Sequence, residues 1–373
     1  MSGAALFQLA LVGLAVAAIP FGWVWVKKGQ DRSRRLVWVT LFLTFDLILF
    51  GAFTRLTDSG LGCPDWPGCY GHSNPIAAAK QIGAAEAAMP TGPVTFTKAW
   101  IEMIHRYLAM GVGALITAIM VLAWKARDLR SPWPATAIFL LVCVQGAFGA
   151  WTVTLKLMPV IVTIHLLLGV ALLCALGLLA GTWAARPALP AATAASLRLP
   201  ARLALAAVFM QIALGGWVST NYAVLACQDF PLCNGAWVPE GDFARGFDIT
   251  RPLGMNDDGT FLPVQALVAI HWVHRVFALV VTALLLWLAS VILRGRHTRE
   301  LDPSAWGLLG LLALQITSGV SNVVFAWPLA VAIVHNGGAA LLALTLVLLN
   351  ARLIVPSTAP APVSLHAHAS LRH

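Results

Sequence analysis

Four histidines lie inside long apolar stretches of this chain: His105, His165, His274 and His335. An ionisable residue at such a depth is a sign of a functional site rather than of simple packing. The spacing repeats, because the first and third histidines are 169 residues apart and the second and fourth are 170 apart. The sequence therefore predicts a duplicated unit that carries one pair of imidazole ligands in each copy.

The composition places these histidines in a membrane. The chain has 373 residues, of which 59% are hydrophobic and only 10% are charged, whereas soluble domains carry about 25% charged residues. Stretches long enough to cross a hydrocarbon layer of about 30 Å occur at 5–26, 36–54, 99–124, 134–155, 159–182, 202–220, 265–293, 305–326 and 329–351. We expect an integral membrane protein with nine spanning helices.

Positive charge gathers on one side of these segments. The loops at 27–35, 125–133, 183–201 and 294–304 hold thirteen of the 24 basic residues, while the opposite connections hold six basic and nine acidic residues. Basic loops mark the cytoplasmic side, so the N-terminus is expected outside and the C-terminus inside. Segment 5–26 is predicted to be a retained helix, because Lys27 and Lys28 follow it. The net charge of +9 then reflects topology and anionic lipid, with no nucleic-acid surface.

A cysteine motif supports the duplication. The pattern C-x-D-[W/F]-P-x-C runs from Cys63 to Cys69 and again from Cys227 to Cys233, at an offset of 164 residues. Two further pairs of positions match at an offset of 170: Gln145 with Gln315, and Gly149 with Gly319. Each copy holds four apolar segments, and an even number gives both copies the same orientation. Their relation is then a pseudo-two-fold axis along the membrane normal.

The predicted fold class follows from this count. It is an all-α polytopic membrane protein with two tandem, pseudo-symmetric four-helix bundles and an extra N-terminal helix. The expected division is 1–35 for the extra helix and its loop, 36–183 for the first repeat, 200–352 for the second repeat and 353–373 for a cytoplasmic tail, which contains His366 and His368.

The histidine pairs favour a heme. Within a copy they come from the second and fourth helices, which run parallel and begin on the outer face, and they lie roughly 9 to 14 Å below it by the helical rise. Two imidazoles that face each other across an apolar gap are the axial ligands of a bis-histidine heme. The alternative is that each histidine bonds a neighbouring helix, which the repeated depth makes less favourable. Zinc is disfavoured because neither pair has a third or fourth ligand nearby.

Residues beside the first histidine of each copy add chemistry. Arg106 and Arg275 follow directly, and a buried guanidinium suits a heme propionate or, alternatively, a lipid phosphate. Glu102 stands three residues before His105, where the second copy has His271. A carboxylate at that depth could move protons or stabilise a developing cation, or could simply cap its helix. The difference suggests that the first copy performs chemistry and the second relays electrons.

The remaining polar residues of the apolar segments are less informative. The four motif cysteines lie outside by the charge rule, where disulfides persist, although metal ligation or thiol–disulfide exchange stays open. Cys143 and Cys174 are expected to be small buried hydrophobic residues. Asp46 has no obvious partner in the sequence beyond a buried hydrogen bond.

The motifs together resemble those of the heme A synthase family. The resemblance rests on TRLTDSGLGCPDWPGCYG at 54–71, EMIHR at 102–106, the His165 helix, ACQDFPLCNG at 226–235, HWVHR at 271–275 and the His335 helix. It covers about residues 36–352, so segment 5–26 lies outside the family's eight-helix core.

The resemblance implies an activity and a set of roles. The family oxidises heme O to heme A, converting a ring methyl to a formyl group by successive hydroxylations, for cytochrome oxidase assembly in the bacterial inner membrane. By position, His105 and His165 would flank the substrate heme O with Glu102 as the catalytic carboxylate, while His274 and His335 would hold a permanent heme b. The cysteine pairs match the family's outer loops, and heme O synthase and oxidase assembly factors are the implied partners.

Two other functions fit some of the same features. A diheme b-type electron-transfer protein between quinol and an outer-face acceptor would need the four histidines but not Glu102, so Glu102→Ala separates it from the enzyme. A transporter with parallel repeats would bind no heme and would show no heme absorbance.

Overall fold

The computed structural model describes residues 3–26, 32–128, 131–182, 189–256, 258–295 and 299–354. Lys27, Lys28 and the tail with His366 and His368 lie outside the described residues. The helices are α1 (Gly3–Val26), α2 (Arg32–Leu56), α3 (Ala79–Ala88), α4 (Phe96–Lys125), α5 (Trp133–Thr154), α6 (Pro159–Gly181), α7 (Ala191–Thr220), α8 (Phe243–Gly246), α9 (Val264–Arg294), α10 (Asp302–Val324) and α11 (Leu329–Ile354), with a 3-10 turn at Arg299–Leu301.

Nine helices of the described part are long and apolar enough to cross a membrane. They match the nine predicted segments, and the prediction of an all-α polytopic membrane protein is confirmed. The largest difference is in α7, which begins at Ala191 rather than 202 and continues through Pro200. Its first turns are rich in alanine, a strong helix former, and two hydrogen bonds tie this part of the helix to α11: Arg198 Nε donates to the Leu353 carbonyl (2.9 Å), and Asn350 Nδ2 donates to the Ala201 carbonyl (3.0 Å).

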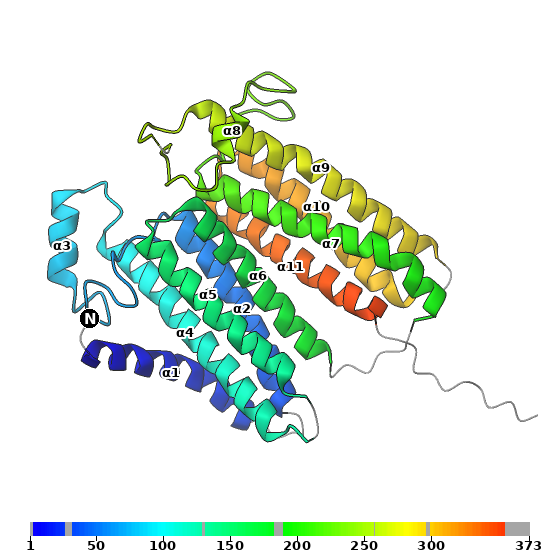
Figure 1. Cartoon of the computed structure of the whole chain (residues 1–373), viewed down its shortest axis with the longest axis horizontal. Coiled ribbons are helices and arrows are strands. Elements are labelled where there is room, and N and C mark those ends of the chain that lie inside the picture. The colour runs from blue at the N-terminus through cyan, green and yellow to red at the C-terminus, as the bar shows by residue number, and fades with distance from the viewer. Residues whose placement is uncertain are drawn as a thin grey trace, which may run out of the picture.

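The spanning helices form two matching rings of four. In the first, α2 contacts α4, α4 contacts α5, α5 contacts α6 and α6 closes the ring on α2. In the second, α7, α9, α10 and α11 contact one another in the same cyclic order. Figure 1 shows the two groups side by side, joined along α2, α6, α7 and α11. This is the pair of tandem bundles that the repeat predicts, and each bundle surrounds its own interior.

Two hydrogen bonds join the copies at the end where α2 and α7 finish. Arg55 donates to the Ser219 carbonyl (2.5 Å), and Tyr222 donates to the Asp58 carboxylate (2.5 Å). Both pairs are 164 residues apart, which is the offset of the repeat. Equivalent positions therefore meet each other, as expected next to a pseudo-two-fold axis.

The extra helix α1 belongs to the first bundle. It contacts α4 and α2 on the flank of that bundle (Figure 1). The close approach uses small residues, because a Cβ on Gly13 would lie 2.9 Å from Met110 Cβ and one on Gly111 would lie 2.6 Å from Val16. Leu9 and Met103, near the starts of α1 and α4, share one hydrophobic cluster, and Val24 and Ile119, near their ends, share another. Helix α1 therefore runs parallel to α4, the helix that carries His105.

Candidate functional site

Each of the four histidines faces a glycine on the preceding spanning helix of its bundle. A Cβ on that glycine would lie within 3.0–3.3 Å of the imidazole, in the pairs Gly51–His105, Gly149–His165, Gly215–His274 and Gly319–His335. Each histidine also lies within the first eleven residues of its helix. The interior of each bundle therefore holds two imidazoles, and the residue that faces each imidazole is a glycine, which has no side chain.

The first bundle contains a cavity of about 480 Å³, a size typical of small-molecule sites, lined by both His105 and His165. Its lining is predominantly apolar and includes Glu102 and Arg106. Trp66 of the first cysteine loop and Thr117, three turns beyond His105 on α4, also line it, so the cavity is elongated along the bundle. The structure thus brings together the pair of histidines predicted for the first copy.

The second pair lies in the second bundle, with His274 on α9 and His335 on α11. Both rings of the second copy have polar neighbours. Gln211 Nε2 lies 3.1 Å from His274 Nδ1, and Ser318 Oγ lies 2.9 Å from His335 Nδ1.

The donor set fits a heme held by two imidazoles. The ligands come as pairs, since no group of three or more His, Cys, Asp and Glu side chains in the described part could hold a metal ion. In the first copy, Nδ1 of His165 is buried without a hydrogen-bond partner. The glycines leave the space beside each ring free of side chains, and the first cavity is apolar. An apolar pocket with facing imidazoles is what a bis-histidine heme requires.

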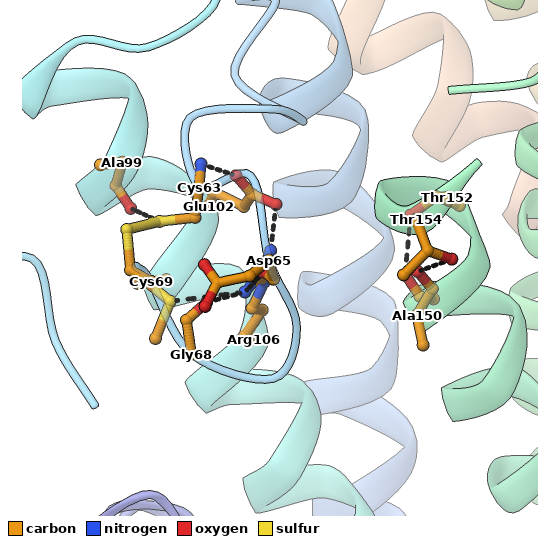
Figure 2. A network of polar contacts seen from close by, with 12 residues as sticks. Cys63, Asp65, Gly68, Cys69, Ala99, Glu102, Arg106, Ala150, Thr152 and Thr154 are labelled. Carbon is orange, nitrogen blue, oxygen red and sulfur yellow. Dashed lines mark hydrogen bonds and ion pairs between the residues drawn. A yellow bond between two sulfur atoms is a disulfide. The ribbon is translucent and has the colours of Figure 1, made fainter. Parts of the chain in front are cut away.

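Glu102 is the centre of a buried polar network beside this cavity (Figure 2). The Cys63 backbone N–H donates to its Oε2 (2.7 Å), and Arg106 donates to its Oε1 (2.5 Å). Arg106 also donates to the carbonyls of Asp65 (2.8 Å) and Gly68. With Glu102 only 3% exposed, the charges are stabilised by pairing and by these further hydrogen bonds. The network joins the carboxylate, its helix and the cysteine loop into one unit.

In the second copy a histidine replaces the glutamate as the anchor of the cysteine loop. The Cys227 backbone N–H donates to Nδ1 of His271 (3.3 Å), as Cys63 does to Glu102. Arg275 donates to the carbonyls of Asp229 (3.0 Å) and Leu232 (3.0 Å) in its own loop. His271, for which the sequence indicated no definite role, therefore anchors the second cysteine loop. It provides no anionic oxygen there.

The guanidinium groups of both arginines contact the backbone of a cysteine loop. Arg106 and Arg275 each donate to carbonyl oxygens of the cysteine loop in their copy, although Arg106 also lines the first cavity. Contact with a heme propionate stays a prediction for both residues. In the structure, the hydrogen bonds of these arginines hold the two cysteine loops in place above the bundles.

The motif cysteines form two disulfides, Cys63–Cys69 and Cys227–Cys233. The aspartate of the motif turns each loop back on itself. In the second loop Asp229 accepts hydrogen bonds from the backbone of Asn234 (2.5 Å) and Gly235 (2.8 Å). The Gly235 hydrogen bond is the main reason why the pKa of Asp229 lies below its usual value. Asp65 accepts the equivalent bonds from Tyr70 and Gly71 in the first loop.

Several functional positions escaped sequence reasoning or were judged wrongly. Cys143 was expected to be buried, and this is wrong: it is exposed and lines the first cavity, whereas Cys174 is buried as predicted. A single sequence shows that α5 is apolar but not which face points to the bundle interior. Asp46 lies half-buried on α2, and we have no physical account of it. Ser318 and Gln211 contact the imidazoles, and apart from their positions in the repeat no feature of the sequence indicates these contacts.

Comparison with known proteins agrees with this arrangement. Residues 34–347 match the model of a family described as cytochrome oxidase assembly protein. A heme A synthase of Shewanella oneidensis is 43% identical over 322 residues, covering 85% of this chain and 96% of the relative. Heme A synthases of a Caulobacter species and of Rhodopseudomonas palustris are each 30% identical, covering 85% and 91% of this chain and 95% and 98% of the relatives. Helix α1 precedes the matched residues. This chain therefore belongs to the heme A synthase family of cytochrome oxidase assembly proteins.

Proposed function

We propose that this chain is a membrane oxidoreductase that converts heme O to heme A. The observation that carries the proposal is the cavity of the first bundle, where His105 and His165 face a common apolar space beside the buried carboxylate of Glu102. The conversion replaces two hydrogens of a ring methyl by one oxygen, through successive hydroxylations. It needs a site that holds the macrocycle by its iron and places a proton-transfer group beside it.

In the first bundle the residues divide into ligands and a proton-transfer group. His105 and His165 bind the iron of the substrate, and the apolar lining of the cavity excludes water. Glu102 accepts or passes on the protons that leave during the oxidation, or stabilises positive charge that develops at the methyl carbon. Arg106 fixes the carboxylate through its 2.5 Å ion pair, so the carboxylate keeps its position while the substrate reacts.

In the second bundle His274 and His335 hold a resident heme b. When bound, a heme would supply one-electron transfer, and His274 and His335 would hold it by its iron. The two bundles share an extensive interface along α2, α6, α7 and α11. Because only the first copy has a carboxylate beside its histidines, we assign the oxidation to the first copy and the electron relay to the second. Arg106 and Arg275 are proposed to contact heme propionates where their loop contacts leave N–H groups free.

The proposed topology places both heme sites toward the outer leaflet of a bacterial inner membrane. The disulfide loops and the N-terminal ends of α4, α6, α9 and α11 share one face. Described basic residues at the start of α2 and at the ends of α4 and α9, namely Arg32, Lys125 and Arg294, lie at the other. The N-terminus is then outside and the C-terminus cytoplasmic. We propose the predicted division into 1–35, 36–183, 200–352 and 353–373, with the start of the second repeat extended back to Ala191, where α7 begins.

The substrate must come from within the membrane. Heme O synthase is the proposed source of heme O, and cytochrome oxidase assembly factors are the proposed acceptors of heme A. The alternative of a diheme electron carrier is not favoured, because it gives the carboxylate of Glu102 no chemical role beyond anchoring its loop and because the relatives carry the name heme A synthase.

The direct test is chromatography of the hemes extracted from the purified full chain, produced together with a heme O synthase. Wild-type protein should yield heme A together with hemes B and O. Glu102→Gln, which keeps the shape of the side chain, should retain hemes B and O and lose heme A. Glu86→Gln in the exposed helix α3 is the matched control and should behave as wild type. Undiminished heme A in Glu102→Gln would contradict the proposed role.

A further inference from the structure

The two copies differ in what contacts Nδ1 of their imidazoles. In the second copy, Ser318 Oγ donates to the Leu314 carbonyl (2.6 Å) and lies 2.9 Å from Nδ1 of His335. A serine hydroxyl has one hydrogen, and here that hydrogen is used for the Leu314 carbonyl. Ser318 must then accept from an Nδ1–H of His335. The lone pair of this ring is therefore on Nε2, the nitrogen that remains for a metal.

The first copy lacks this contact. The residue equivalent to Ser318, 170 positions earlier, is Phe148, which packs edge-to-face against Trp151 with ring centroids 5.0 Å apart. A phenyl ring offers no acceptor of comparable strength to a hydroxyl oxygen. Accordingly, Nδ1 of His165 is buried and has no hydrogen-bond partner. No side chain selects the tautomer of this ligand.

The other matched position also differs in polarity, although here the neighbour of the ring is a donor, the amide nitrogen of Gln211, and not an acceptor. The amide of Gln211 lies 3.1 Å from Nδ1 of His274 and donates to the backbone carbonyl of that residue (3.1 Å). The equivalent residue in the first copy, 164 positions earlier, is Leu47, whose side chain cannot form hydrogen bonds and which lines the first cavity. Both imidazoles of the second copy therefore have a polar neighbour at Nδ1, and the matched positions of the first copy are apolar.

Such contacts decide how firmly an imidazole holds a metal. An acceptor for the Nδ1–H fixes the tautomer and the ring orientation and makes the ligand more basic, and its loss typically lowers metal affinity about 10- to 100-fold. We infer that Ser318 is a positioning residue that keeps His335 ready to ligate a permanent heme, and that Phe148 at the matched position leaves the heme of the first copy exchangeable. This inference rests on the proposed function and explains how one fold can retain one heme and release another.

The test measures heme retention and redox potential in the purified full chain. Ser318→Ala should lose heme B to an excess of a heme-scavenging apoprotein about tenfold faster than wild type. Its heme b should also have a higher midpoint potential, because a less basic axial ligand stabilises ferric iron less. Ser318→Thr keeps the hydroxyl and should restore both values. Ser290→Ala on α9 removes a hydroxyl that bonds only the Trp287 carbonyl, and serves as the matched control.

The reciprocal variant tests the first copy. Phe148→Ser should place an acceptor beside His165 and slow the release of heme O or heme A to the same scavenger. If Ser318→Ala matches Ser290→Ala in both rate and potential, or if Phe148→Ser leaves the release rate unchanged, the inference is overturned. A separate variant, His335→Ala, distinguishes this from failure of the proposed function. If it keeps its full heme B, the assignment of the heme b site itself is wrong.

Discussion

Glu102 and His271 accept the same hydrogen bond in the two copies, each from the backbone N–H of the first cysteine of its loop. The anchoring role is thus common to both residues, while the carboxylate is present only in the first copy. Anchoring and chemistry can be separated experimentally, because each copy provides the natural replacement for the other.

Replacing Glu102 by His should keep the loop and abolish the oxidation. Glu102→His retains an acceptor for the Cys63 N–H but lacks the carboxylate, so the protein should assemble with normal heme B content. Loss of a positioned proton-transfer group typically lowers a rate about 10²- to 10⁴-fold, and heme A in the extract should fall accordingly. Heme A at wild-type levels would show that the carboxylate is only structural.

Adding a methyl group at a histidine-facing glycine should affect one heme at a time. Gly51→Ala places a Cβ 3.1 Å from Nε2 of His105, and Gly215→Ala places one 3.0 Å from Cε1 of His274. Because the ring must move, Gly51→Ala should lower bound heme O and heme A, and Gly215→Ala should lower heme B. Gly310→Ala, whose Cβ meets nothing within 4 Å, is the control. Equal loss of all hemes in both variants would argue against separate sites.

A bulky residue in the first cavity should block the substrate. Gly113 lines this cavity, and a Cβ there meets nothing within 4 Å, so Gly113→Leu would fill open space without displacing a neighbour. We expect loss of heme O binding with heme B unchanged, measured as heme stoichiometry per chain. The control variant Gly310→Leu, in the second bundle, should bind both heme O and heme B. Normal heme O content in Gly113→Leu would place the substrate elsewhere.

The second cysteine loop should become less stable in acid. The pKa of Asp229 is lowered mainly by the Gly235 backbone hydrogen bond, so its stabilising effect is present above the pKa of the unfolded chain and is lost as the pH falls through the depressed value in the folded protein. The Tm of wild type should exceed that of Asp229→Asn near neutral pH, and the gap should narrow as the pH falls through the lowered pKa of the carboxyl. A gap that stays constant over this range would rule out the carboxylate as its source.

The sequence was sufficient for the features that repeat or that follow from hydrophobicity. The histidine pairs, the cysteine loops and the nine apolar segments each recur or extend over many residues, so a single chain displays them. The start of α7 was missed because Arg198 and Pro200 resemble a loop, whereas contacts with α11 hold that part in the helix. The exposure of Cys143 depends on which face of α5 points inward, and α5 is apolar all round.

The contacts of Ser318 and Gln211 with the imidazoles were also out of reach of sequence reasoning. A serine in an apolar helix ordinarily bonds its own backbone, and Ser318 does so as well. Only the packing of α10 against α11 shows that the same oxygen also contacts His335. Such contacts depend on helix rotation, which neither composition nor spacing determines.

We propose that each copy holds its own heme between its own two histidines, the first copy for the substrate and the second for a resident heme. The most direct measurement is heme chromatography on purified His165→Ala and His335→Ala variants. We expect His165→Ala to contain heme B but neither heme O nor heme A, and His335→Ala to lose heme B. If His165→Ala still yields heme A, or if both variants lose the same heme, the assignment of the two copies is contradicted.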